Sequence, residues 1–244
     1  NPYIFIILKE VQMKTKTSSK FKITSLFSVV AIGALLLNGC SSTNSLPETS
    51  PEGMVAIKST KNTIVYKHEY VNFSDYSQVT LDESKASFEK NWQRNYNKSQ
   101  RVSSGRITDK DIEKATKQLA DLMDELFLEE FKTAKGFVER GTTAKGTLLI
   151  RPSIINLKVN APDKVTATRS HTYTDSSGEA TLFLEIFDAN SNELLARVID
   201  RKEDHGMGSG FYQRTTRIDN RADLRRAIRG WAKALRARYD EIPR

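Results

Sequence analysis

An apolar run that ends near the only cysteine constrains the fold more than any other feature of the chain. Residues 23–37 are almost entirely apolar, and Cys40 follows three residues later. A tract rich in Ser, Thr, Asn and Pro begins at Ser41 and offers almost nothing to bury. No second cysteine is available for an intrachain disulfide. The sequence therefore predicts that only residues 62–244 form a folded domain.

The order of residues from Met13 onward resembles a bacterial lipoprotein signal peptide. Lysines precede the apolar run, which at 15 residues is short for a helix that crosses a bilayer. Leu37 and Gly39 match the positions of a lipobox, whereas Asn38 departs from its usual small residue. The resemblance implies that residues 13–39 are a cleaved signal peptide and that Cys40 is acylated and anchors the protein. An uncleaved N-terminal anchor is the alternative.

Two further expectations concern the residues on either side of this signal. Residues 1–12 precede Met13 and are interpreted as an over-extended reading frame. Residues 40–61 are expected to be a flexible tether that spans roughly 25 Å. Ser41 stands where an Asp would favour retention in the inner membrane, so the expected location is the outer membrane, on its periplasmic face.

The charge of the chain does not point to a polyanionic partner. The net charge of +8 includes five Lys and one Glu in residues 1–39, so the rest of the chain carries only +4. An exported, lipid-anchored domain would rarely meet nucleic acid, which we therefore do not expect as a partner. The membrane and a periplasmic protein or the cell wall are the expected partners.

Local patterns predict the first half of the domain. Residues 63–66 and 78–82 are rich in β-branched and aromatic residues and are expected to form strands, whereas residues 88–96 fit either a strand or a loop. Thr108 is a candidate N-cap before a helix whose apolar residues recur through Phe131. Gly136 is expected to terminate this helix.

The second half is expected to contribute a sheet and a final helix. Residues 147–159 form either a strand pair or one strand bent at Pro152, and residues 180–199 form a hairpin. Apolar residues on both sides of the strand 180–187 predict a central strand covered on both faces. A turn at residues 160–163 and a mobile surface loop at 200–217 are also expected.

The final helix, residues 220–242, has an apolar side and a strongly basic side. Its apolar side contains Trp231, which we expect to lie buried against the sheet. The basic side is the best candidate for a functional surface, because its cations could contact anionic phospholipid or cell-wall carboxylates. A solvated face that aids solubility is the alternative. The residues proposed for such contact are Arg221, Arg225, Arg229 and Lys233.

No pattern predicts catalytic residues, metal ligands or a cofactor. His68, His171 and His205 are far apart and lack partners at ligand spacing. The glycines of residues 206–210 fit neither a phosphate-binding loop nor a nucleophile elbow around Ser209, and Asp163 lies in a cluster typical of strand ends. We therefore expect a protein that is not an enzyme.

Seven short segments after Cys40 carry a resemblance to a known family. They are 91–92, 106–109, 151–157, 160–163, 172–174, 178–185 and 231–232. Together they resemble an uncharacterised family of Gram-negative lipoproteins, the domain of unknown function 3313. The similarity covers nearly the whole chain after Cys40, and the family brings no established activity or catalytic residues.

These observations predict one α+β domain, with an antiparallel or mixed sheet and two main amphipathic helices packed on it. The expected function is that of a non-enzymatic envelope lipoprotein that binds a partner. Two other functions stay open at this stage: a cell-wall hydrolase, which needs a nucleophile or a metal set in a cleft, and a carrier of a lipid-like ligand, which needs a roomy apolar cavity.

Overall fold

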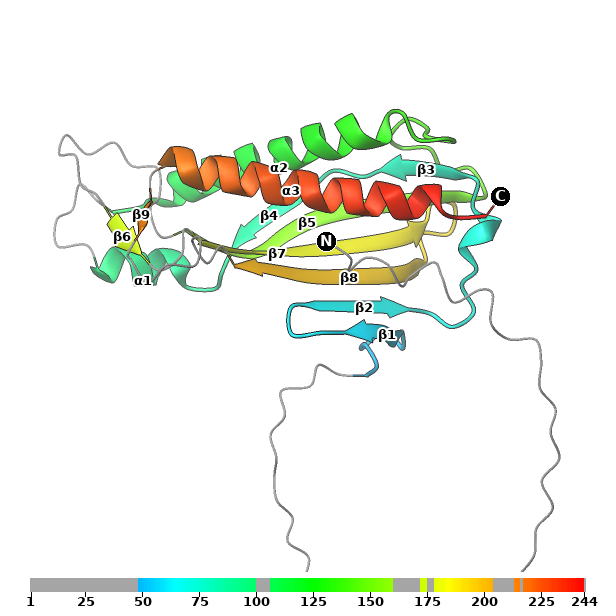
Figure 1. Cartoon of the computed structure of the whole chain (residues 1–244), viewed down its shortest axis with the longest axis horizontal. Helices are drawn as coiled ribbons and strands as arrows, with labels where there is room; N and C mark the ends of the chain where they lie inside the picture. The colour runs from blue at the N-terminus through cyan, green and yellow to red at the C-terminus, as the bar shows by residue number, and fades with distance from the viewer. Residues whose placement is uncertain are drawn as a thin grey trace, which may run out of the picture.

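A mixed seven-stranded sheet is the centre of the structure, a computed structural model that describes residues 48–99, 106–159, 172–174, 178–203, 213–215 and 217–243 (Figure 1). The strands follow the order β1-β2-β8-β7-β5-β3, and β4 also pairs with β5. β3 and β4 run parallel to β5, whereas the other neighbours are antiparallel. The strands of this sheet are β1 (Val55–Ser59), β2 (Thr63–Lys67), β3 (Gln78–Leu81), β4 (Lys85–Phe88), β5 (Thr147–Val159), β7 (Gly178–Asp188) and β8 (Leu194–Glu203).

Two long helices, α2 (Asp109–Phe131) and α3 (Arg217–Asp240), lie side by side on one face of this sheet (Figure 1). The described residues also form helix α1 (Trp92–Ser99), the 3-10 helix η3 (Phe73–Asp75) and a small sheet of β6 (Thr172–Thr174) and β9 (Gln213–Thr215). The predicted α+β class, with a mixed sheet and two main helices, is confirmed.

Helix α2 begins where the sequence predicts, because Thr108 and Asp111 form a capping box. The Thr108 hydroxyl accepts a hydrogen bond from the Asp111 N–H, and the Asp111 carboxylate accepts one from the Thr108 N–H. The helix ends before Gly136, which has another role. At Gly136 φ is +77°, and a Cβ there would lie 2.1 Å from the Ser77 carbonyl oxygen. Glycine is needed because the two backbone segments approach so closely.

β5 is a single strand, and it tolerates Pro152 because of the place of this residue in the sheet. β3 pairs with β5 up to Ile150 and β4 from Ser153 onward, so Pro152 faces the gap between these two strands. The Asp82 N–H still donates to the Ile150 carbonyl, but the next bond would need the N–H that Pro152 lacks. The bend in β5 comes later, at Asn156, where φ is +53° and the register shifts.

The hairpin of β7 and β8 is confirmed, but β8 is longer than the sequence predicts. Its turn is held by the Asp188 carboxylate, which accepts from the Asn190 and Ser191 N–H groups. β8 continues to Glu203, so the predicted loop at 200–217 begins too early. Asp200 belongs to the strand because its carboxylate accepts hydrogen bonds from Thr63 and Trp231. The glycines at 206–210 and the predicted turn at 160–163 lie outside the described residues.

Two predicted boundaries are wrong. The tether expected at residues 40–61 does not extend to residue 61, since β1 pairs with β2 and Met54 is fully buried against Ile64 and Tyr66. The segment 88–96 is mostly neither strand nor loop, because β4 ends at Phe88 and α1 begins at Trp92. The rings of Phe88, Trp92 and Tyr96 stack in succession across this junction.

The space between the helices and the sheet is filled by large side chains. The predicted apolar stripe of α3 is confirmed, with Ile228, Trp231 and Leu235 buried. Other fully buried side chains are those of Met123, Leu126, Phe127 and Phe131 from α2, and of Ile150, Ile154, Leu182 and Leu184 from the sheet. A lipid-like ligand in this layer would have to displace these side chains.

Candidate functional site

The predicted anchor cannot be placed by the fold, since Cys40 and the signal peptide lie outside the described residues. Among the residues that are described, no helix is long and apolar enough to cross a membrane. Lipidation of Cys40 therefore stays a prediction.

The basic side of α3 faces an acidic helix. α2 contains eight acidic and three basic residues, and α3 contains eight basic and three acidic residues. Arg225 pairs with Glu125 at 2.5 Å, and Arg229 pairs with Glu129 at 3.2 Å. Because both partners advance by four residues, the two helices run in the same direction with a ladder of ion pairs between them.

Two further residues of α3 bind the end of α2. Arg236 donates to the Glu130 carbonyl at 2.7 Å and to the Thr133 carbonyl at 3.1 Å. The Tyr239 hydroxyl donates to the Lys135 carbonyl at 2.8 Å. The last turn of α2 contains no basic residue of its own, and Arg236 supplies a donor to one of its terminal carbonyls, that of Glu130. The other two bonds hold the turn that follows α2.

The four cations predicted to contact an anionic surface are thus not equivalent. Arg225 and Arg229 are half-buried and pair with α2, whereas Lys233 is exposed. Arg221 lies within α3, but its side chain is outside the described part of the structure. Contact with an anionic surface stays a prediction, and it would have to compete with the ion pairs of both arginines.

A second arrangement of charges lies on the sheet face that points away from α2 and α3. Arg151 of β5, Glu185 of β7 and Arg197 of β8 stand opposite one another in one row across the three strands. The Arg151 guanidinium lies 4.4 Å from the centre of the Phe187 ring, and that of Arg197 lies 4.9 Å from the centre of the Phe183 ring. We call Arg151, Phe183, Glu185, Phe187 and Arg197 the second-face row.

Arg197 holds two carboxylates at once. Its Nη1 and Nη2 atoms each lie 2.9 Å from an oxygen of Glu52, and its Nη2 lies 2.8 Å from Glu185. The hydrogen bond from Arg197 lowers the pKa of Glu52 to about 2, from a usual value of 4.5. Glu52 precedes β1, so the ion pair fastens the start of the domain to the middle of the sheet.

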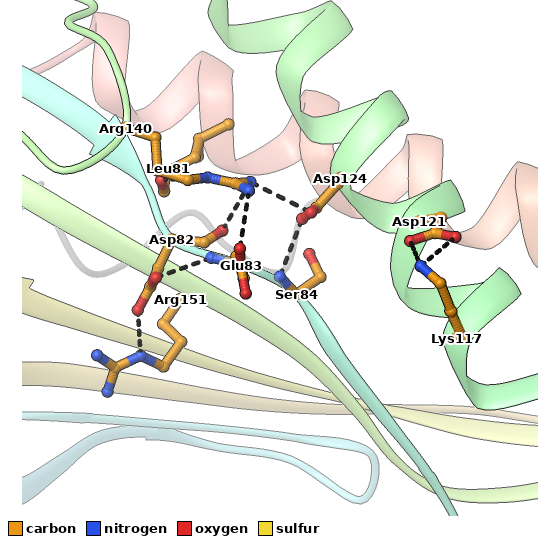
Figure 2. A network of polar contacts seen from close by, with 9 residues as sticks. All are labelled: Leu81, Asp82, Glu83, Ser84, Lys117, Asp121, Asp124, Arg140 and Arg151. Atoms are coloured by element: carbon orange, nitrogen blue, oxygen red, sulfur yellow. Dashed lines mark hydrogen bonds and ion pairs between the residues drawn. The ribbon is translucent and has the colours of Figure 1, made fainter. Parts of the chain in front are cut away.

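Arg151 holds one carboxylate of a neighbouring network, which Figure 2 shows. Its Nε donates to Asp82 at 2.7 Å, and Asp82 also accepts from the Glu83 N–H. Burial raises the pKa of Asp82, but these hydrogen bonds outweigh it and hold the pKa below its usual range. The network therefore contains an ionised carboxylate at neutral pH.

The rest of this network joins the gap between β3 and β4 to α2. Arg140 donates to the Leu81 and Asp82 carbonyls and pairs with Asp124 at 3.2 Å, while Asp124 accepts from the Ser84 N–H (Figure 2). These bonds satisfy backbone groups at the point where the pairing with β5 is interrupted by Pro152. The network has an evident structural role.

The remaining residues weighed in the sequence analysis are the three histidines, Ser209 and Asp163. His68 stacks on Tyr70 with ring centres 5.1 Å apart. His171, His205, Ser209 and Asp163 lie outside the described residues. Within the described part of the chain, no three His, Cys, Asp or Glu side chains are grouped so that they could hold a metal ion.

The sequence analysis missed the second-face row, although a signal was present. Residues 183–187 read Phe-Leu-Glu-Ile-Phe, with a glutamate at the centre of an otherwise apolar strand. We interpreted the two phenylalanines as facing a second covering layer. In the structure they are instead covered by the guanidinium groups of arginines from the neighbouring strands.

Comparison with known proteins gives one family match. The model of the family described as Protein of unknown function (DUF3313) matches residues 52–235. No curated protein sequence matches the chain significantly.

Solved structures give only distant likenesses. A PelC dodecamer from Paraburkholderia phytofirmans is 5% identical, with a TM-score of 0.32 over 70% of this chain and 96% of that chain. A PDZ domain protein from Parabacteroides distasonis is 12% identical, with a TM-score of 0.35 over 75% of this chain and 36% of that chain. At these scores, neither likeness assigns a function.

Proposed function

Because this chain belongs to the family described as Protein of unknown function (DUF3313), whose description assigns no activity, we propose a function from its own residues. The protein is a lipid-anchored envelope lipoprotein that faces the periplasm and acts as a non-enzymatic binding factor.

The second-face row is the observation that carries the binding role. It places two arginines and two phenylalanines on the middle three strands of the sheet, on the face opposite the helices. Alternate residues of β5 on this face, Leu149, Arg151, Ser153 and Ile155, are only half-buried. Aromatic residues and arginine are enriched where proteins bind one another. The polar clusters elsewhere in the described residues serve mainly to hold elements together.

Attachment to the membrane is supported by the sequence around Cys40. The positive region, the apolar run, the lipobox-like residues and the polar tract follow one another in the order of a lipoprotein signal. A single acyl chain binds a membrane only marginally, so a stable anchor requires the several chains of a processed lipoprotein. The residues between Cys40 and Glu48 would then connect the anchor to the first described residues.

Fractionation of the full chain and its Cys40→Ser variant tests the anchor. Wild-type protein should be found with the outer membrane, and mass spectrometry should show a lipid-modified Cys40 at its N-terminus. The variant should be released from the membrane or left uncleaved. Ser41→Asp is the matched control, since it should keep the lipid but move the protein to the inner membrane. A Cys40→Ser protein that is still cleaved and membrane-bound would refute the proposal.

A further inference from the structure

The second-face row has a local two-fold pseudosymmetry centred on Glu185. A rotation about this residue exchanges Phe183 with Phe187 along β7, and Arg151 with Arg197 on the two neighbouring strands. Each arginine covers one phenylalanine ring. The sheet therefore presents two similar half-sites side by side, each with a guanidinium over an aromatic ring.

The half-site of Arg197 is occupied by the protein's own chain. Glu52 binds the Nη1 and Nη2 end of Arg197 through two hydrogen bonds of 2.9 Å, while the Nε edge faces Glu185. Two residues later, Met54 is fully buried beside Ile64 and Tyr66. The occupant is thus a short peptide segment with a carboxylate and an apolar side chain two residues apart.

The half-site of Arg151 is only partly engaged. Its Nε binds Asp82 as the Nε of Arg197 binds Glu185, but among the described residues no acceptor binds its Nη1 or Nη2 atoms. Figure 2 shows both terminal nitrogens directed away from Asp82. The guanidinium stays partly exposed, with 29% of the Arg151 side chain accessible. The end of the guanidinium that binds Glu52 in one half-site is therefore bound by no described residue in the other.

We propose that the Arg151 half-site binds an acidic, extended segment of a partner protein, with a carboxylate on the Nη1 and Nη2 atoms of Arg151. This inference rests on the binding role proposed above and names the chemistry of the partner. A carboxylate is the expected ligand because its negative charge complements Arg151 and because its two oxygens match the two terminal nitrogens of a guanidinium. Glu52 binds Arg197 in this way. Leu149 is half-buried and lies opposite Phe187, two residues before Arg151 on β5, so it would contact an apolar side chain of the same segment.

The position of Arg151 over the Phe187 ring favours this use. The contact restricts the movement of the guanidinium, so the side chain loses less conformational freedom when a carboxylate binds its Nη1 and Nη2 atoms. The contact with Asp82 holds the opposite edge in place. The arginine is thus oriented before the partner arrives.

A peptide copied from the chain itself provides the probe. The blocked peptide Ser-Pro-Glu-Gly-Met-Val, the sequence of residues 50–55, is titrated into the purified full chain and followed by NMR. Resonances of Arg151, Ser153 and Phe187 should shift. The same peptide with Gln in place of Glu should bind at least about tenfold more weakly, because the charge-assisted bonds are lost.

Three variants locate the site. Arg151→Gln should abolish the shifts. If this variant does not fold, Arg151→Lys takes its place, and it should weaken binding because it retains the charge but not the two-pronged geometry. Arg229→Gln is the matched control, since it removes another partly exposed arginine, from the α2–α3 ladder, and should bind the peptide as wild type does.

Four results would overturn the proposal: no shift on titration, shifts confined to Arg197 and Phe183, equal binding of the Gln peptide, or equal binding of succinate. The last would mean that a free carboxylate rather than a peptide is recognised. None of them depends on the membrane anchor, because the titration uses purified protein. A failed anchor test and a failed peptide test are therefore distinguishable.

Discussion

Replacement of Trp231 should reveal how firmly α3 is held on the sheet. Trp231 is 2% exposed, and its indole N–H donates to the Asp200 carboxylate of β8 at 2.7 Å. Truncation of a buried tryptophan to alanine costs about 3–5 kcal/mol of unfolding free energy. Hydrogen bonds to charged groups contribute about 1.5–3 kcal/mol. Trp231→Ala should therefore lie at the upper end of that range, near 5 kcal/mol.

The hydrogen bond can be separated from the burial. Trp231→Phe keeps most of the buried ring but removes the donor, so it should cost about 2 kcal/mol. Asp200 would still accept from Thr63, which keeps its carboxylate from being left unpaired. In a double-mutant cycle of Trp231→Phe with Asp200→Ala, we expect a coupling energy of about 1–2 kcal/mol.

Urea unfolding followed by far-UV circular dichroism measures these changes. Leu128→Ala is the matched control, because this leucine of α2 is 48% exposed and should change stability by less than about 1 kcal/mol. If Trp231→Ala were as stable as Leu128→Ala, α3 would not be packed on the sheet in solution. A coupling energy near zero would show that the bond to Asp200 does not contribute.

Three further changes test other parts of the structure. Gly136→Ala should destabilise the protein strongly, because the added Cβ would clash with backbone atoms. Gly141 also has a positive φ but open space around it, so Gly141→Ala should show only the cost of positive φ, about 1–2 kcal/mol. The midpoints of urea unfolding compare the two variants. Arg229→Glu should destabilise by up to about 1 kcal/mol, and adding Glu129→Arg should restore stability, with both effects smaller at high salt. Glu52→Gln should be less stable than wild type at neutral pH. Because the pKa of Glu52 is lowered in the folded state, this difference in stability should vanish as the pH falls from 4.5 to about 2. Urea unfolding across that pH range measures the difference.

Elements whose signals are local could be predicted from the sequence. The capping box at Thr108 and the turn residues after Asp188 lie within a few positions of the structure that they specify. The α2 helix and the β7–β8 hairpin were therefore found. β1 was missed because its short apolar stretch follows a polar tract, and its burial depends on pairing with β2 and on contacts of Met54 with Tyr66. Local composition contains no information about such pairing.

The candidate site was harder to predict, for a related reason. The basic side of α3 was interpreted as a surface because one helix alone shows which residues are charged, not what they face. Glu125 and Glu129 lie 100 positions before Arg225 and Arg229 in the sequence. Only the packing of two helices in the same direction brings these residues into register. A strongly charged helix face is thus evidence of a function only after its neighbour is known.

The second-face row shows how a sheet face that no described helix covers can avoid a fully exposed aromatic surface. Phenylalanines on an uncovered sheet would favour aggregation. Arg151 and Arg197 shield these rings with their guanidinium groups, whose carbons lie 4.4 and 4.9 Å from the ring centres. Arg197 binds the Glu52 carboxylate while it lies over Phe183, so this contact leaves the hydrogen-bond donors of a guanidinium available. The same two arginines can therefore protect the isolated domain and bind an acidic segment, and neither role requires them to leave the phenylalanine rings.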